Sequence, residues 1–274
     1  MGSFPIVTVF FGTTKLNRMQ QISLTLHGCS LTLFGGGGIY LPEHRLLLVA
    51  DLHLGKEATF RNAAIPVPVG ATGGTLEQLS SLIRHCDCRR VCIVGDLFHD
   101  ADSLSDEIRC DVEAFFQRHV EIEFSLVIGN HDEHVGRLPE RWPVADWGHR
   151  HRLDRVELSH YPADPSDDAA VLFCGHLHPS IKLTHGDDRF GKLPCFWMAD
   201  RTMVMPAFGQ FTGTATVQPR NGDRVWVMAE DSLFEMPASG KLRHRRRVGK
   251  PLESVVATGS VRRAKRVQED SVPE

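Results

Sequence analysis

The chain has 274 residues, of which 42% are hydrophobic and 24% are charged, a composition ordinary for a soluble globular protein. That length is enough to bury a sizeable core, and no run approaches the roughly 20 apolar residues of a membrane-spanning helix. The formal net charge of −3 is unevenly spread, because residues 241–274 hold ten Lys and Arg against four Asp and Glu.

The two ends of the chain differ in character from its centre. The apolar stretch 5–12 is short, follows no basic segment and has no small-residue cleavage site, so we expect a cytoplasmic protein with a poorly structured extension over residues 1–18. Residues 237–274 are expected to form a basic, disordered tail, which leaves residues 19–236 as one domain. Such a tail could follow a nucleic-acid backbone through charge alone, or it could be solvated and unspecific.

The predicted elements follow one another mostly as strand, loop and helix. Residues 22–33 alternate apolar and polar side chains, and the glycines at 35–38 predict a turn that leads into a strand at 46–50. A long loop rich in proline and glycine is expected from there to Thr75. Thr75 and Gln78 match a capping box that would open a helix over residues 76–85.

A second amphipathic helix fits residues 104–118, and further apolar runs predict strands. These strands are expected at 91–94, 124–128, 171–174, 181–183, 195–198, 204–205 and 225–228. The later ones imply a second sheet, so the fold class is α/β.

Seven cysteines follow no framework spacing, which is typical of a reducing compartment. Cys86, Cys88 and Cys92 raise the alternative of a zinc site. Because Cys92 lies inside an apolar run, we interpret these residues as inert core cysteines instead.

Four short polar segments each follow a predicted strand. They are Asp51-Leu52-His53, Gly95-Asp96, Gly129-Asn130-His131-Asp132 and Gly175-His176-Leu177-His178. Short apolar strands with little alternation are buried on both faces, and ligands of α/β folds bind beyond the carboxyl ends of such strands. The polar side chains are therefore expected to meet at one edge of the fold.

The residue types in these segments predict two divalent metal ions. Residues two apart in an extended segment point to the same side, so Asp51 and His53 can share an ion, as can His176 and His178. Asp96, at a strand end, suits a bridging carboxylate. Imidazole with carboxylate and amide oxygen favours Mn²⁺, our first choice, or Fe or Zn²⁺, over Mg²⁺ and Ca²⁺. Two ions about 3.5–4 Å apart would clamp a phosphate and activate a water molecule.

Hydrolysis of a phosphate ester also needs a proton for the leaving oxygen. His131, beside the ligand candidate Asn130, is the predicted general acid. Asp132 is predicted to orient or charge it.

The series D-x-H, G-D, G-N-H-[DE], H and G-H-x-H resembles the calcineurin-like metallophosphoesterase superfamily. The resemblance implies a four-layer α/β/β/α sandwich, with two mixed sheets flanked by helices. It implies a first metal held by Asp51, His53, Asp96 and His178, and a second held by Asp96, Asn130, His160 and His176. For the lone histidine before the last motif, His149, His151 and His185 compete with His160 by position.

The flanking sequence narrows the resemblance. Residues 95–101 lack the second Asp and the Arg of the protein-phosphatase pattern G-D-x-x-D-R-G. Residues 51–56, 60–61, 65–68, 175–179, 193–196 and 205–213 are similar to the bacterial DNA ligase-associated metallophosphoesterases. That similarity implies a phosphodiesterase or nuclease acting on DNA in repair, with an ATP-dependent DNA ligase and a helicase as partners.

Three residues outside the metal set are predicted to contact substrate: Arg61, Lys56 and His99, the last of which either lines the pocket or only finishes a loop. Two other functions stay open: a phosphodiesterase for a small or lipid-linked substrate such as a cyclic nucleotide or a nucleotide-sugar lipid, and a low-turnover binding subunit that recruits a ligase or helicase. The absence of an amphipathic lid counts against a lipid substrate. No membrane contact is expected, and a homodimer stays open.

Overall fold

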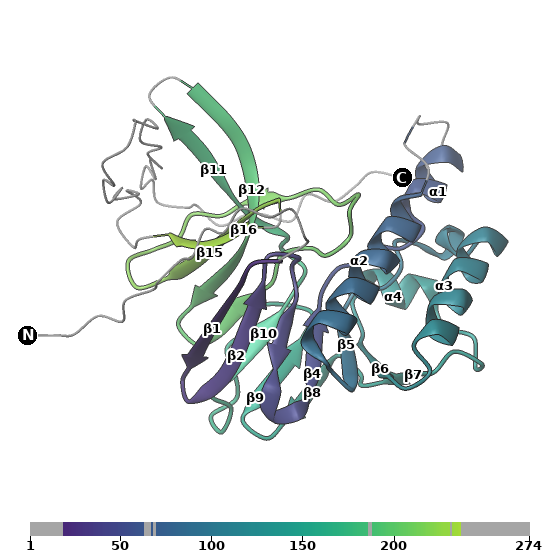
Figure 1. Ribbon diagram of the computed structural model, residues 1–274, viewed down its shortest axis with the longest axis horizontal. Coiled ribbons are helices and arrows are strands. Elements are labelled where there is room, and N and C mark those ends of the chain that lie inside the picture. Colours follow the sequence, from purple (N-terminus) through teal and green to yellow (C-terminus); the bar gives the residue numbers. More distant parts are fainter. Residues whose placement is uncertain (1–18, 63–66, 68–69, 186–187, 231, 237–274) are drawn as a thin grey trace, which may run out of the picture.

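The structure is a computed structural model that describes residues 19–236, except 63–66, 68–69, 186–187 and 231. The expected N-terminal extension and basic tail therefore lie outside the described residues, as do Pro66 and Pro68 of the predicted loop. In the described part, two sheets pack face to face and helices lie against one of them (Figure 1).

The first sheet contains seven strands in chain order within the described residues. Pairing is antiparallel from β1 to β4 and parallel from β4 to β7. The strands are β1 Gln21–Leu26, β2 Cys29–Phe34, β3 Ile39–Leu41, β4 Leu46–Val49, β5 Arg90–Val94, β6 Glu123–Val127 and β7 Val144–Asp146. The predicted glycine turn is confirmed, because the Phe34 N–H donates to the Gly38 carbonyl at 2.9 Å and Gly37 has a φ of 87°.

The second sheet contains nine strands among the described residues, and it too mixes parallel and antiparallel pairs. Its strands are β8 Arg150–Leu153, β9 Val156–Ser159, β10 Val171–Cys174, β11 Pro179–His185, β12 Asp188–Ala199, β13 Thr202–Val204, β14 Ala215–Thr216, β15 Arg224–Ala229 and β16 Ser232–Met236. At its centre β10 runs parallel to both β9 and β13.

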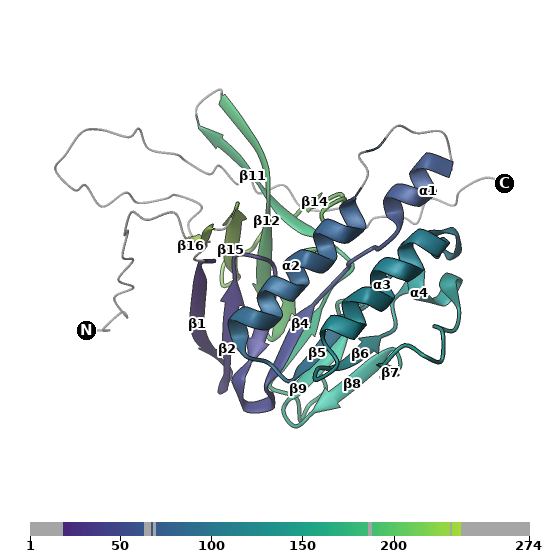
Figure 2. The same ribbon diagram turned by 45° about the vertical axis from the view of Figure 1, so that its right-hand side comes forward.

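The α-helices of the described residues are α1 Lys56–Asn62, α2 Ala71–Cys86, α3 Asp106–Arg118 and α4 Asn130–Val135, with 3₁₀ turns η1 Pro42–His44 and η2 Ala101–Ser103. Figure 2 shows α2 and α3 side by side across the first sheet. The predicted α/β class with two mixed sheets is confirmed. The helix cover is one-sided, since no helix follows Val135 in the described chain. None of the described helices combines the length and apolarity needed to cross a bilayer.

Two hydrophobic clusters lie on opposite faces of the first sheet. In β4, Leu47 and Val49 pack toward the helices, whereas Leu46 and Leu48 pack toward the second sheet. This follows from the two-residue repeat of a strand, which turns successive side chains to opposite faces. All four β4 side chains are buried, which confirms the expectation that strands before the motifs are covered on both faces.

The predicted long loop and the predicted start of α2 are wrong. Residues 56–62 form α1, and α2 begins at Ala71, with Gly70 in the left-handed region as its N-cap. Thr75 lies inside the helix, where its hydroxyl donates to the Ala71 carbonyl at 2.9 Å. The start is set by a distant residue, because the buried Glu57 carboxylate accepts the Thr72 N–H at 2.8 Å. A capping-box pattern cannot report such a tertiary partner.

The zinc alternative for the cysteines finds no support in the fold. Cys92 packs between the two sheets, whereas Cys88 packs on the helix side of the first sheet. All seven cysteines, each within the described residues, are free thiols. Burial raises the pKa of Cys92 to about 12, which keeps it protonated and unreactive.

Candidate metal centre

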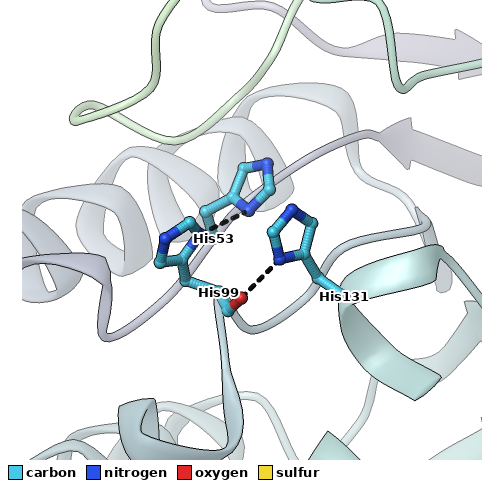
Figure 3. Close-up of side chains that lie close together, drawn as sticks. All are labelled: His53, His99 and His131. Carbon is cyan, nitrogen blue, oxygen red and sulfur yellow. Dashed lines mark hydrogen bonds between the residues drawn. The ribbon is translucent and has the colours of Figure 1, made fainter. Parts of the chain in front are cut away.

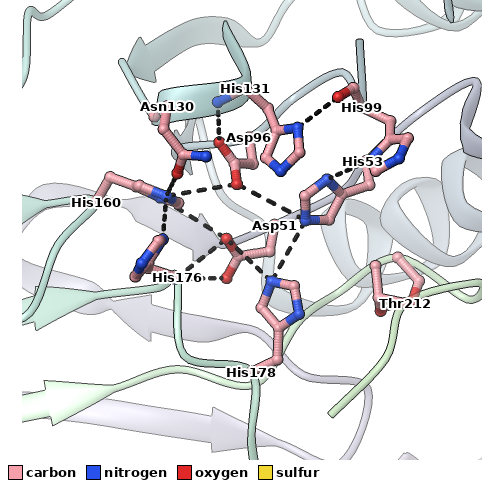
Figure 4. Close-up of polar contacts among 12 residues, drawn as sticks. Asp51, His53, Asp96, His99, Asn130, His131, His160, His176, His178 and Thr212 are labelled. Carbon is pink, nitrogen blue, oxygen red and sulfur yellow. Dashed lines mark hydrogen bonds and ion pairs between the residues drawn. The ribbon is translucent and has the colours of Figure 1, made fainter. Parts of the chain in front are cut away.

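The four motif segments meet at one edge of the fold. They follow the parallel strands β4, β5 and β6 of the first sheet and β10 of the second. Figure 4 shows the seven predicted metal ligands gathered there. Both sheets contribute, because His160 follows β9 and the last motif follows β10 of the second sheet.

One group of ligand atoms, here called the first metal group, comes from Asp51, His53 and His178. These atoms lie within 4.8 Å of one another. The Nε2 atoms of His53 and His178 are 3.3 Å apart. The His178 Nε2 atom is also 3.5 Å from Asp51 Oδ1. Two imidazole nitrogens and a carboxylate oxygen therefore converge on one point, as the first metal site requires.

A second group comes from Asp96, His160 and His176, again with ligand atoms within 4.8 Å. His160 Nε2 lies 3.0 Å from Asn130 Oδ1 and 3.1 Å from His176 Nδ1. The competing His151, which lies in β8, instead stacks on Trp147, with ring centroids 4.0 Å apart. The geometry thus places His160, which is fully buried, at the predicted position.

Asp96 faces both groups. Its Oδ2 atom is 3.7 Å from His53 Nε2 and 3.4 Å from His160 Nε2, while its Oδ1 atom accepts the His131 backbone N–H at 3.0 Å. A single carboxylate oxygen between two sets of imidazoles is the arrangement of a bridging ligand. Imidazole nitrogens with carboxylate and amide oxygens are ligands that transition-metal ions and zinc accept, so the donor set fits two divalent ions.

The pKa values of the buried ligands also favour a bound cation. Burial and the neighbouring Asp51 carboxylate raise the pKa of Asp96 to about 7. Burial lowers the pKa of His160 to about 4, and burial with the nearby His178 lowers the pKa of His53 to about 2. Imidazoles held neutral are ready to donate lone pairs, and a cation would compensate the cost of desolvating two carboxylates.

The segments that carry the ligands are not extended, which corrects the sequence argument. Five ligands have left-handed φ angles between 44° and 68°: Asp51, His53, Asp96, His176 and His178. This region is strained for residues other than glycine and is found where function requires it. Bonds between loops hold it, since the Asp51 N–H donates to the Gly95 carbonyl at 3.1 Å and the His53 N–H to the Asp96 carbonyl at 2.9 Å.

Three motif glycines make room for ligand side chains. A Cβ at Gly95 would lie 2.0 Å from His160 Nδ1, one at Gly129 would lie 2.3 Å from Asp96 Oδ1, and one at Gly175 would lie 2.5 Å from Asp51 Oδ2. No side chain fits at these distances. The glycines are therefore part of the ligand geometry.

The comparisons with known proteins agree with this geometry. The model of the calcineurin-like phosphoesterase family matches residues 44–198, more than half of the chain. The chain belongs to the calcineurin-like phosphoesterase family. It is a metal-dependent phosphoesterase, and the two groups of His and Asp side chains described above could each hold a metal ion.

Solved structures include relatives of this calcineurin-like phosphoesterase. The crystal structure of Pseudomonas putida nuclease MPE is 28% identical, with a TM-score of 0.69, and the match covers 79% of this chain and 100% of that one. The Escherichia coli phosphoesterase Yfce is 16% identical, with a TM-score of 0.33, and the match covers 69% of this chain and 90% of that one. No curated protein matches the chain.

His131 and His99 lie beside the first metal group of this phosphoesterase (Figure 3). The His131 Nδ1 atom hydrogen-bonds the His99 carbonyl oxygen, and the two rings stack with centroids 4.9 Å apart. His99 Nδ1 is 3.4 Å from His53 Nδ1, on the side of the His53 ring away from the metal group. His99 therefore lies beside the site, as one of the two alternatives predicted.

Asp132 contacts the backbone instead of the His131 ring. Its buried carboxylate accepts the N–H groups of Asp96, Leu97 and Gly129 at 2.8, 2.9 and 2.9 Å. The sequence predicted that Asp132 orients His131. Its carboxylate instead holds the loop that carries Asp96, the bridging candidate. Asp132 is a positioning residue for Asp96.

The two basic residues that were predicted to contact substrate, Lys56 and Arg61, lie at different distances from the ligand cluster. Lys56 lies near the imidazoles, with Nζ 5.7 Å from the Phe60 ring centroid, and burial lowers its pKa. Arg61 points elsewhere, because its guanidinium lies 3.8 Å from the Glu107 carboxylate of α3. The structure therefore brings Lys56 to the site and leaves Arg61 outside the ligand cluster.

Residues 206–213 form a loop, here called the 206–213 loop, that completes the site of this phosphoesterase. The Gly209 N–H donates to the Asp51 carbonyl at 3.2 Å, and His178 Nδ1 lies 3.0 Å from the Gly213 carbonyl. A carbonyl acceptor at Nδ1 leaves Nε2 of His178 free to face the metal group. The sequence offered this loop only as a family likeness, since its contribution comes from backbone groups.

Proposed function

We propose that this protein is a binuclear-metal-dependent phosphodiesterase that hydrolyses nucleic acid, acting in DNA repair alongside an ATP-dependent DNA ligase. One observation carries the proposal beyond phosphoesterase: the Pseudomonas putida nuclease is similar over its whole length at 28% identity. The segments that resemble ligase-associated metallophosphoesterases supply the link to repair and to the ligase, and the seven scattered free cysteines support a reducing, cytoplasmic setting.

The two ligand groups support two neighbouring cation sites. Asp51, His53 and His178 would hold the first, His160, His176 and Asn130 the second, and Asp96 both. When bound, two divalent ions, for which we propose Mn²⁺, would neutralise phosphate charge and lower the pKa of a water molecule. Every other part of the reaction falls to the chain's own residues, which orient the phosphate and move the proton.

His131 is suited to protonate the leaving oxygen. Hydrogen bonding of its Nδ1–H to the His99 carbonyl fixes the ring and leaves Nε2 as the nitrogen open to the substrate. The stacked His99 ring restricts rotation further. A general acid held in one orientation beside the metal groups is what transfer to an alkoxide needs.

Lys56 is the proposed contact to a non-bridging phosphate oxygen. It stands at the first turn of α1, three residues after His53 of a ligand-bearing segment, and carries charge toward the imidazoles. Arg61 ranks behind it, because binding a phosphate would require exchange of the Glu107 contact. His99 is the third proposed contact, with its ring 6.0 Å from the Phe60 ring and its Nδ1 3.4 Å from His53 Nδ1.

The deciding experiment is a side-by-side assay of the purified protein with Mn²⁺, Fe²⁺ or Zn²⁺. The substrates are single-stranded DNA, duplex DNA, RNA, a cyclic dinucleotide and a small chromogenic diester. The proposal expects metal-dependent cleavage of a nucleic acid with a kcat/KM above that of the cyclic dinucleotide. Preferred turnover of the cyclic dinucleotide, or inertness toward all nucleic acids in the presence of every metal, would refute it.

A further inference from the structure

A row of aromatic rings leads away from the first metal group. His99 lies 5.4 Å from the His53 ring, Phe60 of α1 lies 6.0 Å from His99, and Phe211 of the 206–213 loop lies 5.7 Å from Phe60. Each contact is edge to face. In Figure 4 the His99 end of this row lies on the opposite side of Asp51 and Asp96 from His160 and His176.

The two phenylalanines do not serve the core. Neither belongs to the hydrophobic clusters of the described residues, nor to the half-buried side chains packed against those clusters. Both rings are half-buried, whereas Phe34, Phe98 and Phe208 are almost fully covered. An apolar ring kept partly in water beside a catalytic centre loses hydrophobic stabilisation, so it calls for a reason.

Both rings are held in place by polar contacts of their own segments. The α1 helix is fixed by the bond between the Glu57 carboxylate and the Thr72 N–H at 2.8 Å. The 206–213 loop is fixed by the Thr212 hydroxyl, which donates to the Gly209 carbonyl at 2.6 Å, and by the Gln210 N–H, which donates to the Thr75 hydroxyl at 3.2 Å. A rigid aromatic surface costs little entropy when a ligand binds to it.

Charge next to the rings indicates what kind of ligand fits. The Lys56 ammonium lies over one face of the Phe60 ring, 5.7 Å from its centroid, so a cation and an aromatic ring with its other face available occupy the same wall. A nucleic-acid strand presents the matching alternation of phosphate and flat base. At about 3.4 Å per stacked nucleotide, Phe60 is within reach of the first few nucleotides beside the scissile phosphate.

We propose that Phe60 and Phe211 form a stacking subsite for an unpaired nucleobase next to the ligands of the first metal. The inference rests on the proposed function and adds the residues that select the substrate. Every base has a π face, so the subsite accepts any sequence. A base inside a duplex has both faces covered by its neighbours and must leave the stack to bind here.

The test uses a short single-stranded oligonucleotide with one cleavable linkage, in an intact form and in forms that lack the base on one side of that linkage or the other. For the unmodified protein, removing the base on one side only is expected to lower kcat/KM by roughly 5- to 150-fold, the range of one lost base–aromatic stack. Phe60→Ala and Phe211→Ala should lower kcat/KM on the intact strand by a similar factor. In these variants, removing the base should then make little further difference.

Three controls separate stacking from damage to the site. Phe60→Tyr keeps the ring and should keep the dependence on the base, whereas Phe60→Leu keeps apolar bulk and should lose it. Val120→Ala, at an 81% exposed apolar residue at the far end of α3, should change nothing. The metal content per chain should be the same in every variant, so that a lost ion does not account for a lower rate.

The outcomes distinguish the two levels of the argument. If the protein cleaves the intact strand and both alanine variants keep the full dependence on the base, the stacking subsite is refuted and the proposed function stands. If base removal has no effect on the unmodified protein, the subsite is refuted as well. If no strand is cleaved while the chromogenic diester is, the proposed function fails and the subsite fails with it.

Discussion

Replacing Asp132 tests whether a residue that touches no predicted ion governs the metal site. Its carboxylate is 6% exposed and accepts three backbone N–H groups at 2.8 to 2.9 Å. Asp132→Ala leaves these donors without an acceptor. At about 1–3 kcal/mol for each unsatisfied buried donor, and with partial relief by water, the free energy of unfolding should fall by about 3–6 kcal/mol.

Asp132→Asn should cost less, because the amide oxygen can take the place of Oδ2 and keep the bonds from Asp96 and Gly129. Only the Leu97 N–H then faces an amide nitrogen, which predicts a loss of about 1–3 kcal/mol. Both variants loosen the loop of the bridging ligand, so metal affinity should fall by about 10- to 100-fold, as for other outer-sphere partners.

The assay is urea unfolding of the metal-free protein, with titration calorimetry of Mn²⁺ in parallel. Burial raises the pKa of Asp132 to about 6, so the measurements belong at pH 8, where the carboxylate is ionised. Glu133→Ala, at an exposed carboxylate of the same helix, is the matched control and should change neither quantity. Equal costs for the Ala and Asn variants, or unchanged metal affinity in both, would refute the reasoning.

Three further predictions concern the ligands, the acid and the scaffold. Asp96→Asn removes charge from the ligand that faces both groups, so metal content after purification should drop below two ions per chain; undiminished occupancy would contradict the bridge. His131→Ala should keep both metals but lose about 10²- to 10⁴-fold in kcat on an unactivated diester, with little loss on a nitrophenyl ester that needs no proton, and equal losses on both would argue against an acid. The hydrogen bond from Arg150, against opposing burial, lowers the pKa of Glu157 to about 2 from an ordinary value of 4.5. This pair should therefore add about 3 kcal/mol to the free energy of unfolding above pH 4.5, and this contribution should disappear as the pH falls toward 2. Glu157→Gln should flatten that part of the curve of unfolding free energy against pH.

The four motif segments could be placed from the sequence because each follows a short apolar strand, and strand ends meet at one edge whatever the details of the loops, whereas His160 came from the family resemblance alone. The strands before Asp51, Asp96, Asn130 and His176 lie where the apolar runs placed them. What the sequence could not supply was the local backbone. The left-handed angles at Asp51 and His53 depend on carbonyl partners more than forty residues away.

The contacts that the sequence did not reveal have one cause in common. The place of Arg61 near the first motif predicts a substrate contact, and in the fold its guanidinium also lies 3.8 Å from Glu107 on another helix. The start of α2 was misread because Glu57, not a local cap, binds its first turn. Asp132 was paired with its chain neighbour His131, whereas its acceptor atoms serve the loop after β5. Each depends on a partner that only the folded chain brings near.

Because each group of ligands combines side chains from both sheets, bound cations would act as cross-links between the two halves of the sandwich. Asp51 and His53 stand on one side of such a link and His178 on the other. Supply of the ion would then govern the lifetime of the protein as well as its turnover, since binding to the native state alone adds to the work of pulling the sheets apart. A cell starved of that ion would hold a population that is idle and also easier to degrade.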